Sequence, residues 1–171
     1  MSVTGDKDLV RNMQELSHID LKQAVQDGIH LIRDTAVYLC PVDMGELRQS
    51  IQTSVTEHGG TIIGTCYTNK AYAIYVELGT GPKGQRNHEG ISPDINPLYT
   101  QTPWWIHESM VDRRVAEKYH WFHIDTKAGR FYQCTGQAAQ PFMYPALENN
   151  KDRLMKGIRA DFRAEVERIT K

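Results

Sequence analysis

The sequence lacks a long apolar run, an excess of charge of one sign and a paired set of cysteines. No apolar stretch in its 171 residues approaches the roughly 18 residues that a membrane-spanning helix needs. The 20 basic and 21 acidic side chains leave a net charge of −1, which argues against a dedicated nucleic-acid binder, because such proteins usually carry a clear basic excess. The first eleven residues contain no apolar signal-peptide core.

Cysteine and histidine are too scattered to indicate a metal centre. The three cysteines, Cys40, Cys66 and Cys134, are odd in number and far apart, which favours neither a disulfide framework nor a zinc site. His120 and His123 lie three residues apart, and on a strand they would face opposite sides. We therefore expect no metal and no cofactor, and a soluble protein kept in a reducing cytosol. The 40% apolar and 24% charged residues are ordinary globular values.

Apolar residues recur at helical spacing near both ends of the chain. The stripe from Leu21 to Cys40 predicts a helix of about five turns, which Pro41 ends. Ser17 and Asp20 resemble a capping box at its start. A shorter stripe from Leu9 to Leu16 predicts a separate helix before it, and Ala146 to Ile169 predicts a long closing helix.

Between these helices the pattern changes to strands and loops. Alternation from Ile51 and again from Thr61 to Tyr67, with Gly59-Gly60 between, predicts a β-hairpin. Residues 119–124 and 130–134 predict a second hairpin. Asp43 and Glu46 are spaced like an N-cap and the acid three residues later, and Thr102-Pro103 resembles the start of another helix.

Residues 79–103 hold eight glycines and prolines without periodicity, and long loops of this kind tend to be functional. The predicted fold is α+β: a long N-terminal helix, antiparallel hairpins forming a small sheet, a loop insertion at about 79–103 and a C-terminal helix. We expect one domain over residues 1–171.

The string Gly79-Thr80-Gly81-Pro82-Lys83-Gly84 matches G-x-G-x-x-G, the pattern of dinucleotide-binding loops. A phosphate site needs that turn to follow a strand and open a helix, and neither is indicated here. A small nucleotide-binding or hydrolytic enzyme using this loop and Glu77 stays an alternative. The structural interpretation is a bending loop.

Other candidate residues have ordinary structural interpretations as well. Glu77 is the single acid in an apolar stretch, and we expect it to accept hydrogen bonds from the backbone amides of residues 79–81 or to pair with an arginine. Trp104, Trp105 and Tyr99 could stack on bases, but aromatic residues at the start of a helix are more often core or interface anchors. Lys83 and Arg86 could meet a phosphate backbone only weakly.

Three strings taken together carry a family resemblance. Residues 40–51 resemble the pattern P-v-d-T-G-x-L-r-x-S-I, residues 71–81 resemble Y-A-x-y-v-E-f-G-T-g, and residues 140–146 resemble x-P-F-m-x-P-A. In this order the strings are similar to those of the gene-product-ten-like family of tailed bacteriophages, the neck or tail-completion proteins. Met44 departs from the pattern, because the family commonly has threonine there, and this leaves the capping role to Asp43.

The resemblance implies a virion structural protein of the head–tail junction without enzymatic activity, made in the host bacterial cytoplasm. It implies a homo-oligomeric ring, commonly sixfold, that contacts head-closure and tail proteins and transiently contacts packaged DNA. A tail-terminator ring is the alternative. The motif positions expected to serve folding or assembly are Pro41, Asp43, Gly45, Leu47, Ser50, Tyr72, Ala73, Tyr75, Glu77, Gly79, Thr80, Gly81, Pro141, Phe142, Pro145 and Ala146. The candidate interface residues are Lys83, Arg86, Tyr99, Trp104 and Trp105.

Overall fold

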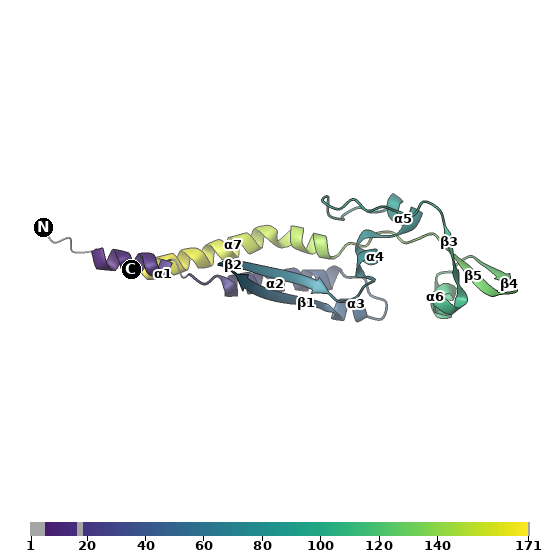
Figure 1. Ribbon diagram of the computed structural model, residues 1–171, viewed down its shortest axis with the longest axis horizontal. Coiled ribbons are helices and arrows are strands. Elements are labelled where there is room, and N and C mark those ends of the chain that lie inside the picture. The colour runs from purple at the N-terminus through teal and green to yellow at the C-terminus, as the bar shows by residue number, and fades with distance from the viewer. Residues whose placement is uncertain (1–5, 17–18, 171) are drawn as a thin grey trace. The chain divides into compact units, whose positions relative to one another are not determined.

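The computed structural model describes residues 6–16 and 19–170 (Figure 1). The chain forms two compact units, and the second is inserted into the sequence of the first. The helix–hairpin unit comprises Met1–Asn69 and Pro145–Lys171, and the inserted unit comprises Lys70–Tyr144. Helices and two small antiparallel sheets confirm the predicted α+β class.

The helices of the first unit follow the apolar stripes of the sequence. They are α1 (Asp6–Leu16), α2 (Lys22–Leu39), α3 (Glu46–Gln49) and α7 (Met143–Thr170), whose first two residues belong to the inserted unit. The backbone amide of Lys22 donates to Asp20 Oδ1 at 2.8 Å, but the N-cap residue of α2 is Leu21 and its side chain makes no capping bond. Asp20 therefore lies before the helix, and the predicted capping box, which places it inside the helix, is wrong. The predicted partner in that cap, Ser17, lies outside the described residues.

The first predicted hairpin is confirmed. Strand β1 (Ile51–His58) pairs with β2 (Thr61–Thr68) in unbroken antiparallel register from Ile51↔Thr68 to His58↔Thr61. Gly59 and Gly60 have φ values of 57° and 79°, the left-handed conformations of a two-residue type I′ turn. Glycine adopts this pair of angles without the strain that a side chain would add.

Helix α2 packs against both of its neighbours through glycines. A Cβ built on Gly64 of β2 would lie 3.0 Å from Val25 Cγ1, so the missing side chain lets the hairpin approach α2 closely. Gly28 likewise makes room for Leu154 of α7. Figure 1 shows the hairpin and α7 each running along α2. Buried apolar side chains in this unit include Ile29, Ile32, Ala36, Cys40, Leu47, Ile51 and Ala146.

The inserted unit holds short helices and a three-stranded sheet. Its elements are α4 (Ala73–Leu78), α5 (Gly81–Arg86), β3 (Trp104–His107), η1 (Glu108–Met110), α6 (Arg113–Lys118), β4 (His123–Thr126) and β5 (Gly129–Cys134). The sheet order is β3-β5-β4, with all pairs antiparallel. The β4–β5 pair confirms the second predicted hairpin, although residues 119–122 precede the strand.

Three sequence predictions in this unit are wrong. The helix expected after Thr102-Pro103 is strand β3, because Trp104 to His107 find backbone partners on β5 about 30 residues later in the chain. The expected loop at 79–103 contains α5 at residues 81–86. His120 lies in the turn after α6 with φ 51°, and not on a strand beside His123.

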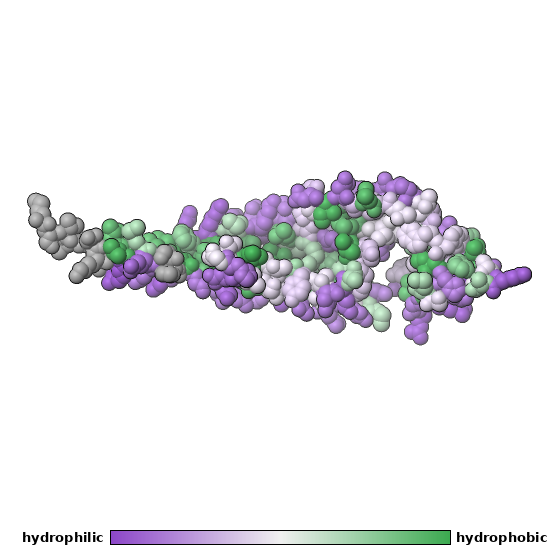
Figure 2. Space-filling model, in the orientation of Figure 1, coloured by the Kyte–Doolittle hydropathy of each residue, from purple (hydrophilic) through white to green (hydrophobic). Residues whose placement is uncertain are grey.

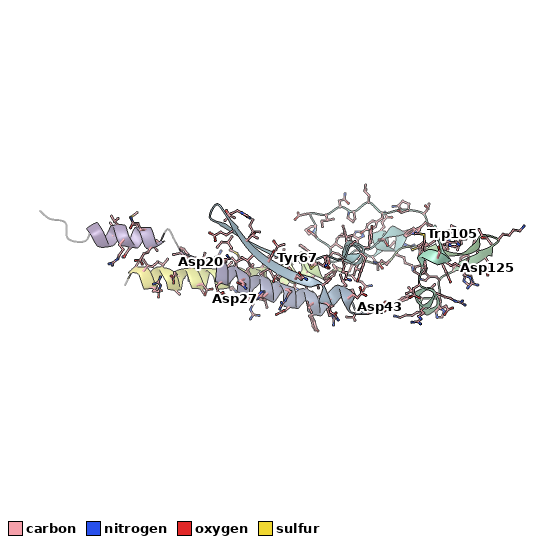
Figure 3. The ribbon with its side chains drawn as sticks, turned by 60° about the horizontal axis from the view of Figure 1, so that its bottom comes forward. Asp20, Asp27, Asp43, Tyr67, Trp105 and Asp125 are labelled. Carbon is pink, nitrogen blue, oxygen red and sulfur yellow. The ribbon has the colours of Figure 1, made fainter. Side chains whose placement is uncertain are left out.

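The two faces of the three-stranded sheet differ. On one face, Tyr132 of β5 is 4% exposed and packs edge-on against Trp121, beside the buried Ala116 of α6. On the other, Trp105 is 42% exposed and lies 6.1 Å from the ring of Phe122. Figure 3 shows Trp105 and Asp125 on this sheet.

Candidate assembly site

Glu77 closes the N-terminus of the long helix α7. Its carboxylate accepts hydrogen bonds from three consecutive backbone amides, those of Phe142 at 2.7 Å, Met143 at 3.0 Å and Tyr144 at 2.9 Å. Met143 and Tyr144 are the first two residues of α7, whose amides have no carbonyl partner within the helix, and Phe142 directly precedes them. A carboxylate there also interacts favourably with the helix dipole. Glu77 is therefore an N-cap supplied by α4, about 65 residues earlier in the chain.

The sequence predicted backbone amides as partners of Glu77 but placed them at residues 79–81. The structure corrects the partner, because the bonds go to the string around Phe142. The predicted position was wrong because the residues next to Glu77 carry no signal for a contact with a segment about 65 residues away. The type of partner follows from the chemistry of a lone acid in an apolar stretch.

The second and third family-like strings pack directly on each other. The amide of Gln140 donates to the carbonyl of Val76 at 2.8 Å, and Gln137 Nε2 donates to the carbonyl of Tyr75 at 2.7 Å. Thr80 and Gln137 form an isolated antiparallel bridge with amide–carbonyl distances of 2.9 and 3.1 Å. Phe142 is fully buried. These contacts make α4, the turn after it and residues 137–142 one small framework.

The glycine string serves close packing in this framework. A Cβ on Gly79 would lie 2.7 Å from the amide nitrogen of Ala139, and one on Gly84 would lie 2.9 Å from a Tyr99 ring carbon. Gly79 and Gly81 have φ values of 74° and 59°, positive angles that glycine adopts without strain, so the chain bends at this string as the sequence predicts. The string follows a helix, and both Gly81 and Gly84 are buried. It therefore lacks the strand-to-helix context of a dinucleotide loop.

A groove of about 690 Å³ opens beside α4. Apolar side chains of α4 and of residues 97–99 line it, together with Trp104 and Gln137. The Tyr99 hydroxyl donates to the carbonyl of Leu78 at 2.7 Å, and desolvation raises the pKa of this phenol above its ordinary value. The large apolar side chains at this groove are well exposed: Tyr72 at 43%, Ile74 and Tyr75 at 57%, and Leu98 at 100%.

The first string lies in the helix–hairpin unit. Leu47 is 6% exposed, and Ser50 Oγ donates to the carbonyl of Leu47 at 2.7 Å. Arg48 Nη2 donates to the carbonyl of Cys40 at 2.8 Å. The N-cap residue of α3 is Gly45 with φ 85°, so the sequence prediction that Asp43 occupies this position is wrong. Only a left-handed residue makes the turn here, which explains the glycine.

The candidate interface residues lie on different elements. Lys83 and Arg86 are exposed on α5. Trp104 lines the groove, whereas Trp105 points to the open face of the three-stranded sheet. The interface roles of these residues stay predictions. The sequence missed the role of Gln137, because its bonds to Tyr75 and Thr80 join segments nearly 60 residues apart.

Other chemistry finds little support in the described part of the chain. Among residues 6–16 and 19–170, no group of three or more His, Cys, Asp or Glu side chains could hold a metal ion. Cys40 is 1% exposed, and burial raises the pKa of the Cys66 thiol, which keeps it protonated and poorly nucleophilic. No helix in the same described ranges is long and apolar enough to cross a membrane.

The comparisons with known proteins give one match. No curated protein and no solved structure matches the chain. Residues 7–79 match the family model described as "Bacteriophage HK97-gp10, putative tail-component". The matched region runs from α1 through the hairpin to Gly79 after α4, and so includes the first string, residues 71–79 of the second string and Glu77. Over residues 7–79, this chain is therefore similar to the HK97-gp10-like family of bacteriophage tail components.

Proposed function

We propose that the protein is a structural component of a phage or prophage virion that forms a ring at the head–tail junction. The observation that carries the proposal is the family match over residues 7–79, whose description names a tail component. In this proposal the whole chain acts as one neck-type subunit, and the inserted unit supplies contacts to neighbouring copies or to the adjacent head-closure and tail proteins. The protein is then located in the neck of the virion.

The surface of the inserted unit supports a role in assembly. Tyr72, which directly precedes α4, and Ile74 and Tyr75 of α4 are each at least 43% exposed. Tyrosines and aliphatic residues gathered at a groove are typical of protein interfaces. Trp105 and Phe122 form a second exposed aromatic pair on the same unit. A subunit buried between neighbours would cover such groups.

The site also fits a non-catalytic role. The one acid of the α4 stretch, Glu77, is engaged by three backbone amides, which leaves it poorly suited to act as a general base. The space beside the glycines of residues 79–84 is occupied by neighbouring backbone and by Tyr99. The residues of the site therefore hold the fold together, which suits a structural protein.

A stop codon in the gene of the parent phage tests the proposal. A missing neck component leaves filled heads and complete tails unjoined, and electron microscopy of the lysate would show them separately. Complementation with the wild-type gene should restore joined virions. Tails of abnormal length would favour a tail-terminator ring in place of the neck. Normal infectious virions that lack the protein would contradict the structural proposal.

A further inference from the structure

The β1–β2 hairpin has two open edges. Within the described residues its sheet contains only these two strands, each eight residues long, so each strand has one side without a strand partner. An edge strand presents unpaired amide and carbonyl groups that can pair with another strand. Proteins that avoid such pairing block their edges with lysine, proline, bulges or very short strands.

The hairpin has none of these devices, and its one charged side chain is Glu57, near the turn end of β1. The two strands contain no lysine and no proline, and their register runs without a bulge from Ile51↔Thr68 to His58↔Thr61. Strand β2, Thr-Ile-Ile-Gly-Thr-Cys-Tyr-Thr, carries no charged side chain. Uncharged strands rich in β-branched residues pair readily when left exposed. The hairpin is therefore built to accept a strand at its edges.

The turn determines which backbone groups face outward. In a two-residue type I′ turn, the flanking residues, here His58 and Thr61, form a hydrogen-bonded pair, and such pairs then alternate along an antiparallel ladder. The backbone groups of the intervening residues point away from the partner strand. In β1 the outward amides belong to Thr53, Val55 and Glu57, and in β2 to Ile62, Gly64 and Cys66.

The width of the unit suits side-by-side packing of copies. Two strands span about 9.5 Å across the sheet, close to the roughly 10–12 Å diameter of a helix with side chains. Helix α2 runs along one face of the hairpin (Figure 1), so in each copy one helix covers the two strands. Neighbouring hairpins can then meet edge to edge while each keeps its own α2.

The face of the hairpin away from α2 is neutral. It presents polar side chains such as Ser54 and Thr65 together with Ile63 at 47% exposure and Tyr67 at 40%. Tyr67 Oη donates across this face to Gln52 Oε1 at 3.2 Å (Figure 3). In Figure 2 the surface over β1 is mostly pale, as expected of serine and threonine. No acidic or lysine side chain on this face would oppose a neighbouring strand.

We infer that the occupant of each edge is a second copy of this chain, and that β1 of one copy pairs antiparallel with β2 of the next. Side-by-side hairpins run up and down in turn, so every new contact is antiparallel. The contact is head-to-tail, since each copy offers two different edges, and a head-to-tail contact closes into a ring when its rotation allows. This inference rests on the proposed function and names the surface by which its subunits join.

Hydrogen exchange of the full-length protein tests the pairing at single-residue resolution. Dilute monomer and the isolated assembly are compared under the same conditions. The amides of Thr53, Val55, Glu57, Ile62 and Cys66 should exchange rapidly in the monomer. In the assembly their exchange should slow by about 100-fold or more, as for other hydrogen-bonded sheet amides. The amides of Ser54 and Thr65, which pair inside the hairpin, serve as the internal control and should be protected in both states.

Each outcome has a distinct meaning. Protection of both outward sets on assembly supports the inference. An assembly in which either set still exchanges rapidly refutes head-to-tail strand pairing, while the proposed function stands. Outward amides already protected in the monomer also refute it, because the chain itself would then cover the edges. A chain that does not assemble at any concentration, with or without other phage proteins, refutes both the inference and the proposed ring.

A proline substitution gives an independent readout. Glu57→Pro removes an outward amide, and its ring would block strand addition while the inner bonds of the hairpin stay in place. The matched control, Glu57→Ala, removes the same side chain and keeps the amide. We expect the proline variant to fold and assemble at least about 10-fold more weakly than the alanine variant. Equal assembly of the two folded variants would overturn the inference.

Discussion

Replacing Glu77 by glutamine should destabilise the start of α7 while leaving the shape of the side chain nearly unchanged. Glu77 Oε2 accepts two amide bonds and Oε1 accepts one. Glutamine offers one carbonyl oxygen, so its NH₂ group must face at least one backbone N–H that needs an acceptor. The variant therefore loses a bond to a charged acceptor and the favourable interaction of that charge with the helix dipole.

The magnitude follows from these two losses. A hydrogen bond to a charged group contributes about 1.5–3 kcal/mol, and an acid at a helix N-terminus about 0.3–1 kcal/mol. Glu77 is partly exposed, and water recovers a fraction of both. We expect Glu77→Gln to lower the free energy of unfolding by about 1–3 kcal/mol. With a urea slope of about 2 kcal/mol per molar, the midpoint should fall by about 0.5–1.5 M.

Urea unfolding followed by far-ultraviolet circular dichroism measures this effect. Glu89→Gln is the matched control, because Glu89 is exposed and carries the same change of charge. The control should unfold within about 0.5 kcal/mol of the wild type, as surface substitutions usually do. If Glu77→Gln unfolded at the same urea concentration as Glu89→Gln, the three amide bonds would contribute nothing measurable and the capping role would be refuted.

Three further substitutions test the packing. Gly84→Ala should lower the free energy of unfolding by about 1–3 kcal/mol, because the new Cβ would lie 2.9 Å from backbone and from the Tyr99 ring. Gly157→Ala, on the open surface of α7, should raise it by about 0.5–1 kcal/mol. Thermal melts that rank the two variants in the opposite order would refute this packing. Asn150→Ala should lower the free energy of unfolding by about 1–3 kcal/mol, since the buried side-chain amide donates to Thr35 Oγ1 and to the Ala146 carbonyl. An unchanged melting temperature would show that these two bonds do not stabilise the fold. The bond to Arg130 lowers the pKa of Asp125, so this carboxylate stabilises the fold above its unfolded pKa of about 3.9 and ceases to do so as the pH falls through its folded pKa. Asp125→Asn should therefore be less stable than the wild type at pH 7 but not in acid. A loss of stability that does not depend on pH would contradict the ion pair.

Local patterns in the sequence were sufficient for the regular elements of the helix–hairpin unit. The alternation on either side of Gly59-Gly60 predicts β1 and β2 because both the period and the turn chemistry are local. The stripe from Leu21 predicts α2 for the same reason. These elements carry their own signals, and the structure confirms them.

The inserted unit escaped prediction where distant contacts decide the structure. Thr102-Pro103 favours a helix locally, but Trp104 pairs with Cys134 on β5 and the segment becomes a strand. The glycines of α5 disfavour a helix, yet packing against residues 135–139 holds one in place. At the candidate site, a lone acid indicates that Glu77 needs amide partners, whereas their identity depends on a contact across 65 residues.

We propose that this chain forms a ring at the head–tail junction, and an electron cryo-microscopy map of the intact virion neck tests this proposal most directly. We expect a ring of density in the neck whose subunits fit the helix–hairpin unit, with α2 resolved against the β1–β2 hairpin and α7 along α2. A neck whose rings are all accounted for by other proteins, or virions that contain none of this chain, would contradict it.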